Sequence, residues 1–95
     1  MWVLLIVAVL VSGQPIAAAN SQLPTCFGRQ ATISGSEFLL GTSGNDVIVG
    51  SEDVDLIDGL GGDDLICSLG GDDIVRGGLG HDMLDAGAGS DLLLG

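Results

Sequence analysis

Residues 41–67 read GTSGNDVIV, GSEDVDLID and GLGGDDLIC when they are divided into three blocks of nine. Each block begins with glycine, has aspartate at its sixth position and has isoleucine at its eighth. A fixed period of this kind indicates a solenoid, in which every repeat forms the same structural unit. The repeat therefore decides the fold class before any single residue is considered.

The same register extends in both directions and gives seven consecutive blocks over residues 32–94. The fourth position is glycine in every block except the third, which has Asp53. The sixth position is always acidic: Glu37, Asp46, Asp55, Asp64, Asp73, Asp82 and Asp91. The eighth is always aliphatic: Leu39, Ile48, Ile57, Ile66, Val75, Leu84 and Leu93. Because only 13 of the 95 residues are acidic, this regularity is not a chance arrangement.

Each block divides into a turn and a short strand at positions seven to nine. Glycine at positions one and four allows the positive φ or close backbone approach of a tight turn. Side-chain alternation places position eight on one face of the strand and positions seven and nine on the other. Two blocks then make one coil, and stacked coils make two sheets around the position-eight side chains. The sequence predicts an all-β fold, a parallel β-roll or β-helix solenoid.

This pattern resembles the haemolysin-type calcium-binding (RTX) nonapeptide repeat, whose signature is G-G-x-G-x-D-x-U-x. Residues 41–94 match it well as six nonapeptides, and residues 32–40 match loosely and are expected to form a degenerate cap. The resemblance implies a β-roll that holds calcium ions between the turns of successive coils. The layout, with an early cysteine, ATISG (31–35) and DLIC (64–67), is similar to that of small secreted bacterial proteins built from such repeats.

The acidic residues of alternate blocks should stack along the two edges of the coil at the strand spacing of about 4.8 Å. Two charges about 5 Å apart repel each other by about 3 kcal/mol at an effective dielectric constant of about 20. A cation between the turns is therefore expected. Calcium fits best, because it accepts six to eight oxygen ligands in irregular geometry, whereas magnesium requires an octahedron. Softer metals prefer histidine and cysteine.

The best candidate ligand pairs are Asp64 with Asp82 on one edge and Asp73 with Asp91 on the other. Asp46 paired with Asp64 comes next. Because the metal would relieve the repulsion between coils, we expect calcium binding to be coupled to folding.

Other acidic residues are weaker candidates. Asp55 belongs to a turn in which residues 51–53 (Ser-Glu-Asp) replace the glycine and add two charges. Glu37 is longer than the motif requires. Asp63 and Asp72 lie at position five, where aspartate more often forms the turn than binds metal. The position-nine acids are expected to be solvated.

The N-terminus has the features of a secretory signal peptide. Residues 2–11 are an unbroken apolar run, and Ala17–Ala19 provide a small-residue cleavage site, so residues 1–19 are expected to be removed. The run is short for a membrane span. We therefore expect an extracellular bacterial protein without membrane contact after cleavage; an uncleaved anchor and a misplaced start codon are the alternatives.

Export bears on the two cysteines, Cys26 and Cys67. In an oxidising compartment they are expected to form a disulfide, and the alternative is two free thiols. The bond would draw residues 20–31 across the outward face of one sheet, where the apolar position-seven side chains need cover. Self-association through these outward positions, or through the open C-terminal edge of the roll in residues 32–95, is the alternative use of this surface.

The composition excludes several functions. The net charge of −11, with two arginines and no lysine, argues against binding to nucleic acid. No HExxH, GxSxG or Walker A motif occurs, so no enzymatic activity is expected. The sequence predicts a secreted, non-enzymatic calcium-binding protein. The alternative is a repeat module detached from a larger RTX enzyme, toxin or adhesin, in which it would serve secretion, folding or surface binding.

Overall fold

The computed structural model describes residues 23–95, and within this range the chain forms ten short strands and no helix. The strands are β1 (Thr25–Cys26), β2 (Arg29–Gln30), β3 (Ile33–Ser34), β4 (Phe38–Leu40), β5 (Val47–Val49), β6 (Leu56–Asp58), β7 (Leu65–Cys67), β8 (Ile74–Arg76), β9 (Met83–Asp85) and β10 (Leu92–Leu94). From β4 onward, each strand occupies positions seven to nine of its block, as predicted.

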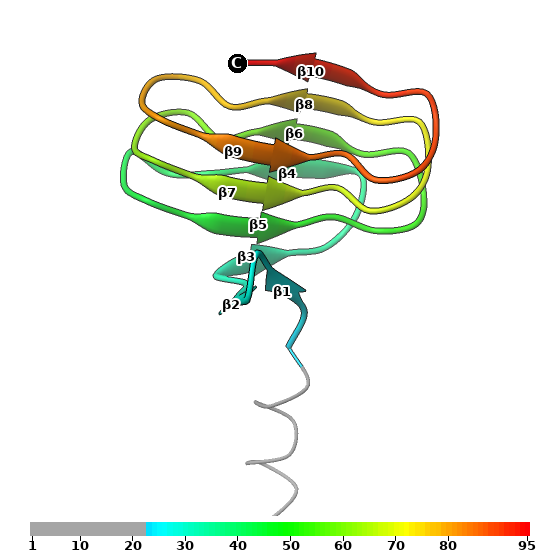
Figure 1. Cartoon of the computed structure of the whole chain (residues 1–95), viewed down its shortest axis with the longest axis horizontal. Helices are drawn as coiled ribbons and strands as arrows, with labels where there is room; N and C mark the ends of the chain where they lie inside the picture. The colour runs from blue at the N-terminus through cyan, green and yellow to red at the C-terminus, as the bar shows by residue number, and fades with distance from the viewer. Residues whose placement is uncertain (1–22) are drawn as a thin grey trace, which may run out of the picture.

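Successive strands alternate between two parallel sheets, so the chain winds as a solenoid (Figure 1). One sheet has the order β3-β5-β7-β9 and the other the order β10-β8-β6-β4. From β4 onward, paired strands are two blocks apart in the sequence, and Ile48 pairs with Ile66 and Ile57 with Val75. The backbone ladder continues into the turns, where the Gly59 N–H donates to the Arg76 carbonyl oxygen at 2.8 Å.

The first coil departs from the predicted register. β3 pairs with β5 through Ile33 and Ile48, which are closer in the sequence than two full blocks, and β3 lies at the start of the first block instead of at its end. The block therefore contains two strands, β3 and β4, one in each sheet. Residues 32–40 thus close the N-terminal end of both sheets with a shorter connection than the later coils use.

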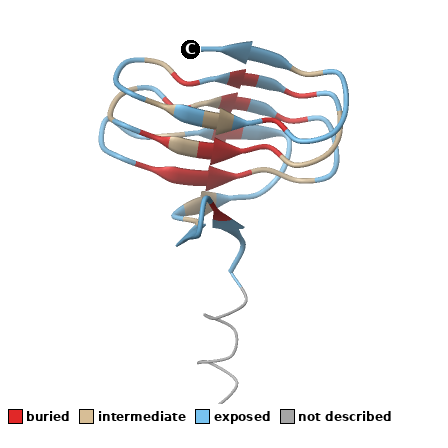
Figure 2. Ribbon diagram, in the orientation of Figure 1, coloured by how far each residue is buried: buried red, intermediate tan, exposed pale blue. Residues whose placement is uncertain are grey.

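The core between the sheets consists of the position-eight side chains. Ile48, Ile57 and Ile66 are fully buried, Val75 and Leu39 are nearly so, and Ile33 and Leu84 pack against them. The central residue of each strand from β4 to β8 is buried, and further buried residues lie in the turns (Figure 2). Leu93 in β10 is exposed, because this strand has a neighbour on one side alone and its sheet ends there.

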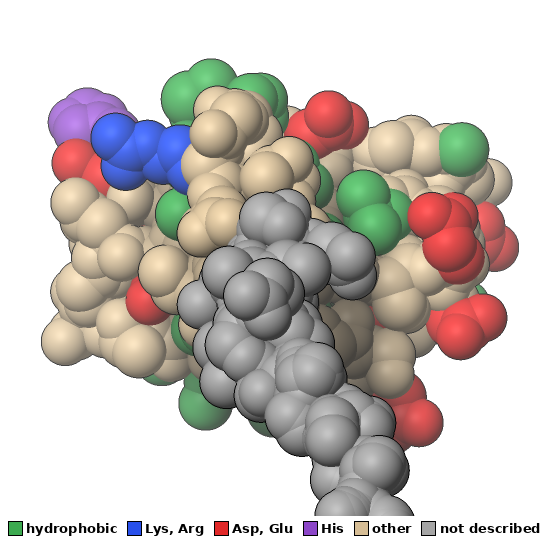
Figure 3. All heavy atoms as spheres, turned by 90° about the horizontal axis from the view of Figure 1, so that it is seen from below, with side chains coloured by type: hydrophobic (Ala, Val, Ile, Leu, Met, Phe, Trp, Pro, Cys, Tyr) green, Lys and Arg blue, Asp and Glu red, His purple; other side chains and the backbone are tan. Residues whose placement is uncertain are grey.

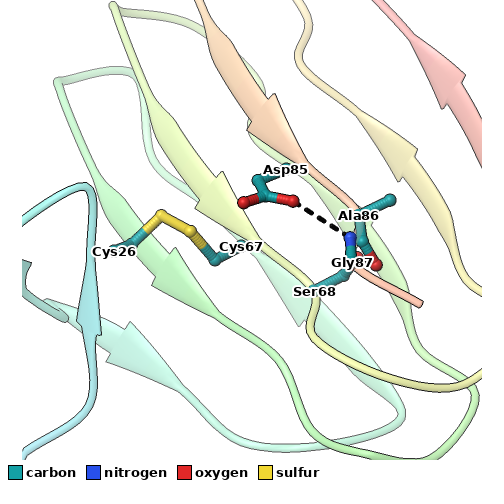
Figure 4. Close-up of a disulfide and its surroundings, with 6 residues drawn as sticks. All are labelled: Cys26, Cys67, Ser68, Asp85, Ala86 and Gly87. Atoms are coloured by element: carbon teal, nitrogen blue, oxygen red, sulfur yellow. Dashed lines mark hydrogen bonds between the residues drawn. A yellow bond between two sulfur atoms is a disulfide. The ribbon is translucent and has the colours of Figure 1, made fainter.

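A disulfide between Cys26 and Cys67 fixes the N-terminal hairpin β1–β2 against the outer face of the sheet that contains β5 and β7 (Figure 4). Both cysteines are buried and form a second apolar cluster with Val47 and Val49. The predicted disulfide is therefore present, and the N-terminal segment covers one outward face as expected.

The outer face of the other sheet has no such cover among residues 23–95. Its exposed apolar side chains are Phe38, Leu40, Leu56, Ile74, Leu92 and Leu94. The predicted signal peptide, residues 1–19, lies outside the described residues. Within the described range, no helix is long and apolar enough to cross a membrane.

Candidate metal centre

The position-six aspartates form a ladder along each edge of the coil. Every one of them after Asp46 accepts a hydrogen bond at Oδ1 from the backbone N–H of the acid one coil earlier. On one edge the Asp46 N–H donates to Asp64, and the Asp64 N–H to Asp82, at 2.8 Å. The other edge carries the equivalent bonds at 2.8–2.9 Å, from Glu37 to Asp55, Asp55 to Asp73 and Asp73 to Asp91. The predicted stacking of the acidic residues along the two edges is thus confirmed. Most of these aspartates are buried, and the acidic side chains (red) that Figure 3 shows together at one edge belong to the molecular surface.

The second carboxylate oxygen separates these aspartates into two groups. In Asp64, Asp73 and Asp82 the Oδ2 atom is buried and has no hydrogen-bond partner. The Asp64 and Asp73 side chains are at most 1% exposed, so water does not replace the missing partner at their surfaces. A buried oxygen with a formal charge and no donor is costly. These atoms therefore require a ligand that the protein chain does not supply.

In the two turns that come before these in the sequence, the protein itself donates hydrogen bonds to Oδ2 of the position-six aspartate. The Thr42 N–H donates to Asp46 Oδ2 at 2.8 Å, and the Thr42 hydroxyl lies 3.0 and 3.1 Å from the two carboxylate oxygens. Ser51 makes the same set of contacts with Asp55, at 2.8, 3.0 and 3.2 Å. Both hydroxyls are at position two of their blocks. We call these two turns, residues 41–46 and 50–55, the closed turns.

The four later turns, residues 59–64, 68–73, 77–82 and 86–91, have a different backbone conformation, and we call them the open turns. Positions two and four both have positive φ, with values of 68° at Leu60 and 85° at Gly62 in the first of them. In two of these turns the position-two N–H bonds the preceding position-nine acid instead: the Leu60 N–H donates to Asp58 Oδ1 at 3.1 Å and the Gly87 N–H to Asp85 Oδ1 at 3.0 Å. The change at position two is therefore the reason that Oδ2 loses its donor.

The open turns also bring backbone carbonyl oxygens close to the next coil. A Cβ atom added at Gly78 would collide with the Leu60 carbonyl oxygen, and one at Gly80 would collide with that of Gly62. The other edge repeats the arrangement, with Gly87 against Leu69 and Gly89 against Gly71. Glycine at these positions is therefore required by the close approach as well as by φ.

Position-one glycine makes room for the unpaired oxygen. A Cβ atom on Gly59 would lie 2.7 Å from Asp64 Oδ2, and one on Gly77 would lie 2.7 Å from Asp82 Oδ2. The Asp64 and Asp82 carboxylates thus lie beside bare backbone, as those of Asp46 and Asp55 do beside Gly41 and Gly50. The turn of Asp73 instead has Ser68 at position one. Two kinds of oxygen, carboxylate and main-chain carbonyl, are concentrated along the same edge.

The remaining acidic residues have other roles. Asp63 and Asp72 each accept a position-five N–H from the next coil, from His81 and Ser90, at 2.9 Å. Asp85 accepts the Gly87 N–H at 3.0 Å.

Asp58, which was expected to be solvated, pairs with Arg76 at 3.6 Å in addition to bonding Leu60. Glu37 is exposed, has a positive φ of 74° and contributes its backbone N–H to the ladder. Thr42 and Ser51 were not singled out from the sequence, although their place at position two of an acidic turn is a readable signal.

The carboxylate and carbonyl oxygens of the open turns are suitable ligands for a hard divalent cation. Residues 23–95 contain no group of three or more His, Cys, Asp or Glu side chains close enough together to hold a metal ion by themselves. An ion at an edge must therefore use backbone carbonyl oxygens together with the carboxylates. Calcium accepts such mixed oxygen ligands in irregular geometry, and the unpaired Oδ2 atoms are suitable charged members of the set.

Burial raises the pKa of the Asp64 carboxyl, and the neighbouring Asp46 and Asp82 carboxylates raise it further, against the lowering effect of the hydrogen bond from the Asp46 N–H. A raised pKa in the folded state means that Asp64 favours folding below its unfolded value of 3.8, and that this contribution is lost as the pH rises through the folded value.

In calcium-free solution, we therefore expect acidification from neutral pH to increase the β-sheet content. Circular dichroism in EDTA across this pH range measures it. The gain should be smaller in Asp64→Asn, which does not titrate at this position, and an equal gain in both proteins would show that Asp64 does not cause it.

Comparison with protein families matches the model of the RTX calcium-binding nonapeptide repeat (4 copies) to residues 32–66 and 69–95. No curated protein and no solved structure gives a significant match. The matched residues include both aspartate ladders and all of the closed and open turns except residue 68, and the family implies calcium as the ligand of the repeats. The coil of two blocks, the glycine turns and the matched residues together place this chain in the RTX calcium-binding repeat family.

Proposed function

We propose that this protein is a secreted calcium-binding β-roll without catalytic activity, and that Asp64, Asp82, Asp73 and Asp91 supply the carboxylates. The observation that carries the proposal is the buried, unpartnered Oδ2 atom of Asp64, Asp73 and Asp82. Asp64 and Asp82 serve one edge, and Asp73 and Asp91 the other. Carbonyl oxygens at positions two and four complete the ligand set. Bound calcium supplies the positive charge that the turns lack.

Calcium would act here as a structural ion. It neutralises carboxylates of neighbouring coils, which otherwise repel each other by about 3 kcal/mol at a separation of about 5 Å. It also gives the buried oxygens a partner, so that desolvating them no longer opposes folding. Because the site is assembled from two coils, it exists in the folded chain alone, and binding is coupled to folding.

Asparagine at position 64 tests the proposed ligand. Asp64→Asn removes the charge and preserves the shape, so we expect calcium affinity to fall about 100-fold, the equivalent of the roughly 3 kcal/mol interaction of one charge pair. The calcium-free protein should not lose β-sheet, because a buried charge has been removed. Isothermal titration calorimetry measures the first effect and circular dichroism in EDTA the second.

Asp85→Asn is the matched control. It removes the same charge from an exposed position-nine residue whose carboxylate bonds the Gly87 N–H. Its calcium affinity should change by less than about threefold, as expected for a solvated charge. Equal losses in both variants would mean that net charge, and not a ligand at position 64, determines affinity.

The buried disulfide supports the proposal of secretion, because such bonds persist in oxidising compartments. The sequence pattern of residues 1–19 supports it independently. The alternative is that these repeats are a module of a larger RTX protein. The intact mass of the species recovered from the culture medium of the producing cells distinguishes the two, and also gives the cleavage site and the state of the cysteines.

A further inference from the structure

We infer that Thr42 and Ser51 take the place of calcium in the two closed turns, so that the N-terminal coil folds without metal and acts as a preformed template for the calcium-dependent coils. This inference rests on the proposed function. It assigns residues 41–58 and residues 59–94 to different modes of folding, although all of them belong to one continuous repeat.

The carboxylate oxygens of the closed turns already have partners. Asp46 and Asp55 each receive bonds at both oxygens from the backbone N–H and hydroxyl of position two, and Asp55 Oδ1 also accepts the Glu37 N–H. Their side chains are nonetheless buried, at 6% and 1% exposure. A buried acid with its oxygens occupied by donors gains little from a metal ion. The sequence-based prediction that Asp46 and Asp55 bind calcium is therefore replaced by this one.

The position-two residues stack along each edge, one from each successive coil. One edge carries Thr42, Leu60 and Gly78 in this order. The other edge carries Ser51, Leu69 and Gly87. On both edges the hydroxyl residue comes first and is the one without positive φ. The change from closed to open turns thus occurs at the same coil boundary on both sides.

The closed turns lie where other contacts already hold the chain. β5, which follows the first closed turn, is buried under the hairpin β1–β2 through Val47 and Val49. The disulfide joins this hairpin to β7. The closed turns, the apolar cluster and the disulfide therefore stabilise the same end of the solenoid, and none of them requires an ion.

The template has a clear physical role. Parallel strands of separate coils gain nothing until a first coil exists, so starting the stack is its least favourable step. A coil that is ordered before calcium arrives offers the backbone groups of β5 and β6 to the next coil. Each ion then has to stabilise the addition of a coil and not the start of the stack.

Hydrogen exchange of the unmodified, disulfide-bonded protein in EDTA tests the inference directly. We expect slowed exchange at the amides of β5 and β6, and fast exchange at those of β8, β9 and β10. Calcium should then slow exchange in β8 to β10. Loss of protection in all strands alike in EDTA would overturn the inference while leaving calcium binding intact. Failure of calcium to protect any strand would overturn the proposed function instead.

A reciprocal exchange at position two tests the residues. Thr42→Gly removes the hydroxyl and permits positive φ, so calcium stoichiometry in native mass spectrometry should rise by one ion, and protection of β5 in EDTA should fall. Leu60→Thr, the equivalent position one coil later, should lower the stoichiometry by one. Unchanged stoichiometry in both variants would contradict the inference.

Ser43→Gly is the matched control for Thr42→Gly. It removes a hydroxyl from the adjacent exposed residue, and within residues 23–95 that side chain makes none of the bonds to Asp46. Stoichiometry and protection should remain those of the unmodified protein. If Ser43→Gly produced the same changes as Thr42→Gly, general loosening of the turn would be the cause and the inference would fail.

Discussion

Removal of calcium with EDTA should abolish most of the parallel β-sheet signal in circular dichroism, and millimolar calcium should restore it. The reason is electrostatic: Asp64, Asp73 and Asp82 each have a buried oxygen without a partner, and successive acids are stacked on each edge. The glycine-rich turns add to the effect, because glycine loses more conformational freedom on folding than other residues do.

Magnesium at the same concentration is the control for this first prediction. It prefers a regular octahedron and retains water, so the irregular mixture of carbonyl and carboxylate oxygens should bind it weakly. Refolding by calcium and not by magnesium is therefore expected. Equal β-sheet content in EDTA and in calcium would show that the coils stack without metal.

Reduction of the Cys26–Cys67 bond should sharply raise the calcium concentration needed for folding. The bond closes a loop with a sequence separation of 41, for which the chain-entropy relation gives about 4 kcal/mol. An energy of this size changes the folding equilibrium constant by a factor of about a thousand. If two ions bind in one cooperative step, folding depends on the square of the calcium concentration. The calcium midpoint should then rise by the square root of this factor, about thirtyfold.

Calcium titrations followed by circular dichroism, with and without a reductant, measure this shift. The double variant Cys26→Ser and Cys67→Ser should behave like the reduced protein, which separates loss of the bond from side effects of the reductant. In EDTA the reduced chain should be largely disordered. A midpoint that does not move on reduction would mean that the N-terminal hairpin does not support the coils.

The repeat made most of the fold predictable. Every strand from β4 to β10 lies at positions seven to nine, because φ, burial and pairing are all tied to the same period. The register of the nine-residue repeat is enough to predict that Ile57 and Ile66 are buried and that the position-six aspartates of successive coils lie next to one another. The disulfide and the covered outer face were also foreseen, from two cysteines and an apolar position seven.

The irregular parts were not predictable in the same way. β1, β2 and β3 are two-residue strands outside the period, and hydrophobic alternation gives no signal over so short a length. The open and closed turns differ in the sign of φ at position two. Leucine does not ordinarily adopt positive φ, so nothing in the sequence indicates that Leu60 and Leu69 would have values of 68° and 69°.

A crystal structure of the protein grown in calcium, with the anomalous signal of the metal recorded, tests the central claim most directly. We predict anomalous peaks about 2.3–2.6 Å from the Oδ2 atoms of the open-turn aspartates, the range of calcium–oxygen distances in proteins. No peak is expected beside Asp46 Oδ2 or Asp55 Oδ2. Well-ordered open turns in which Asp64 and Asp73 face solvent, with no metal beside them, would contradict the account.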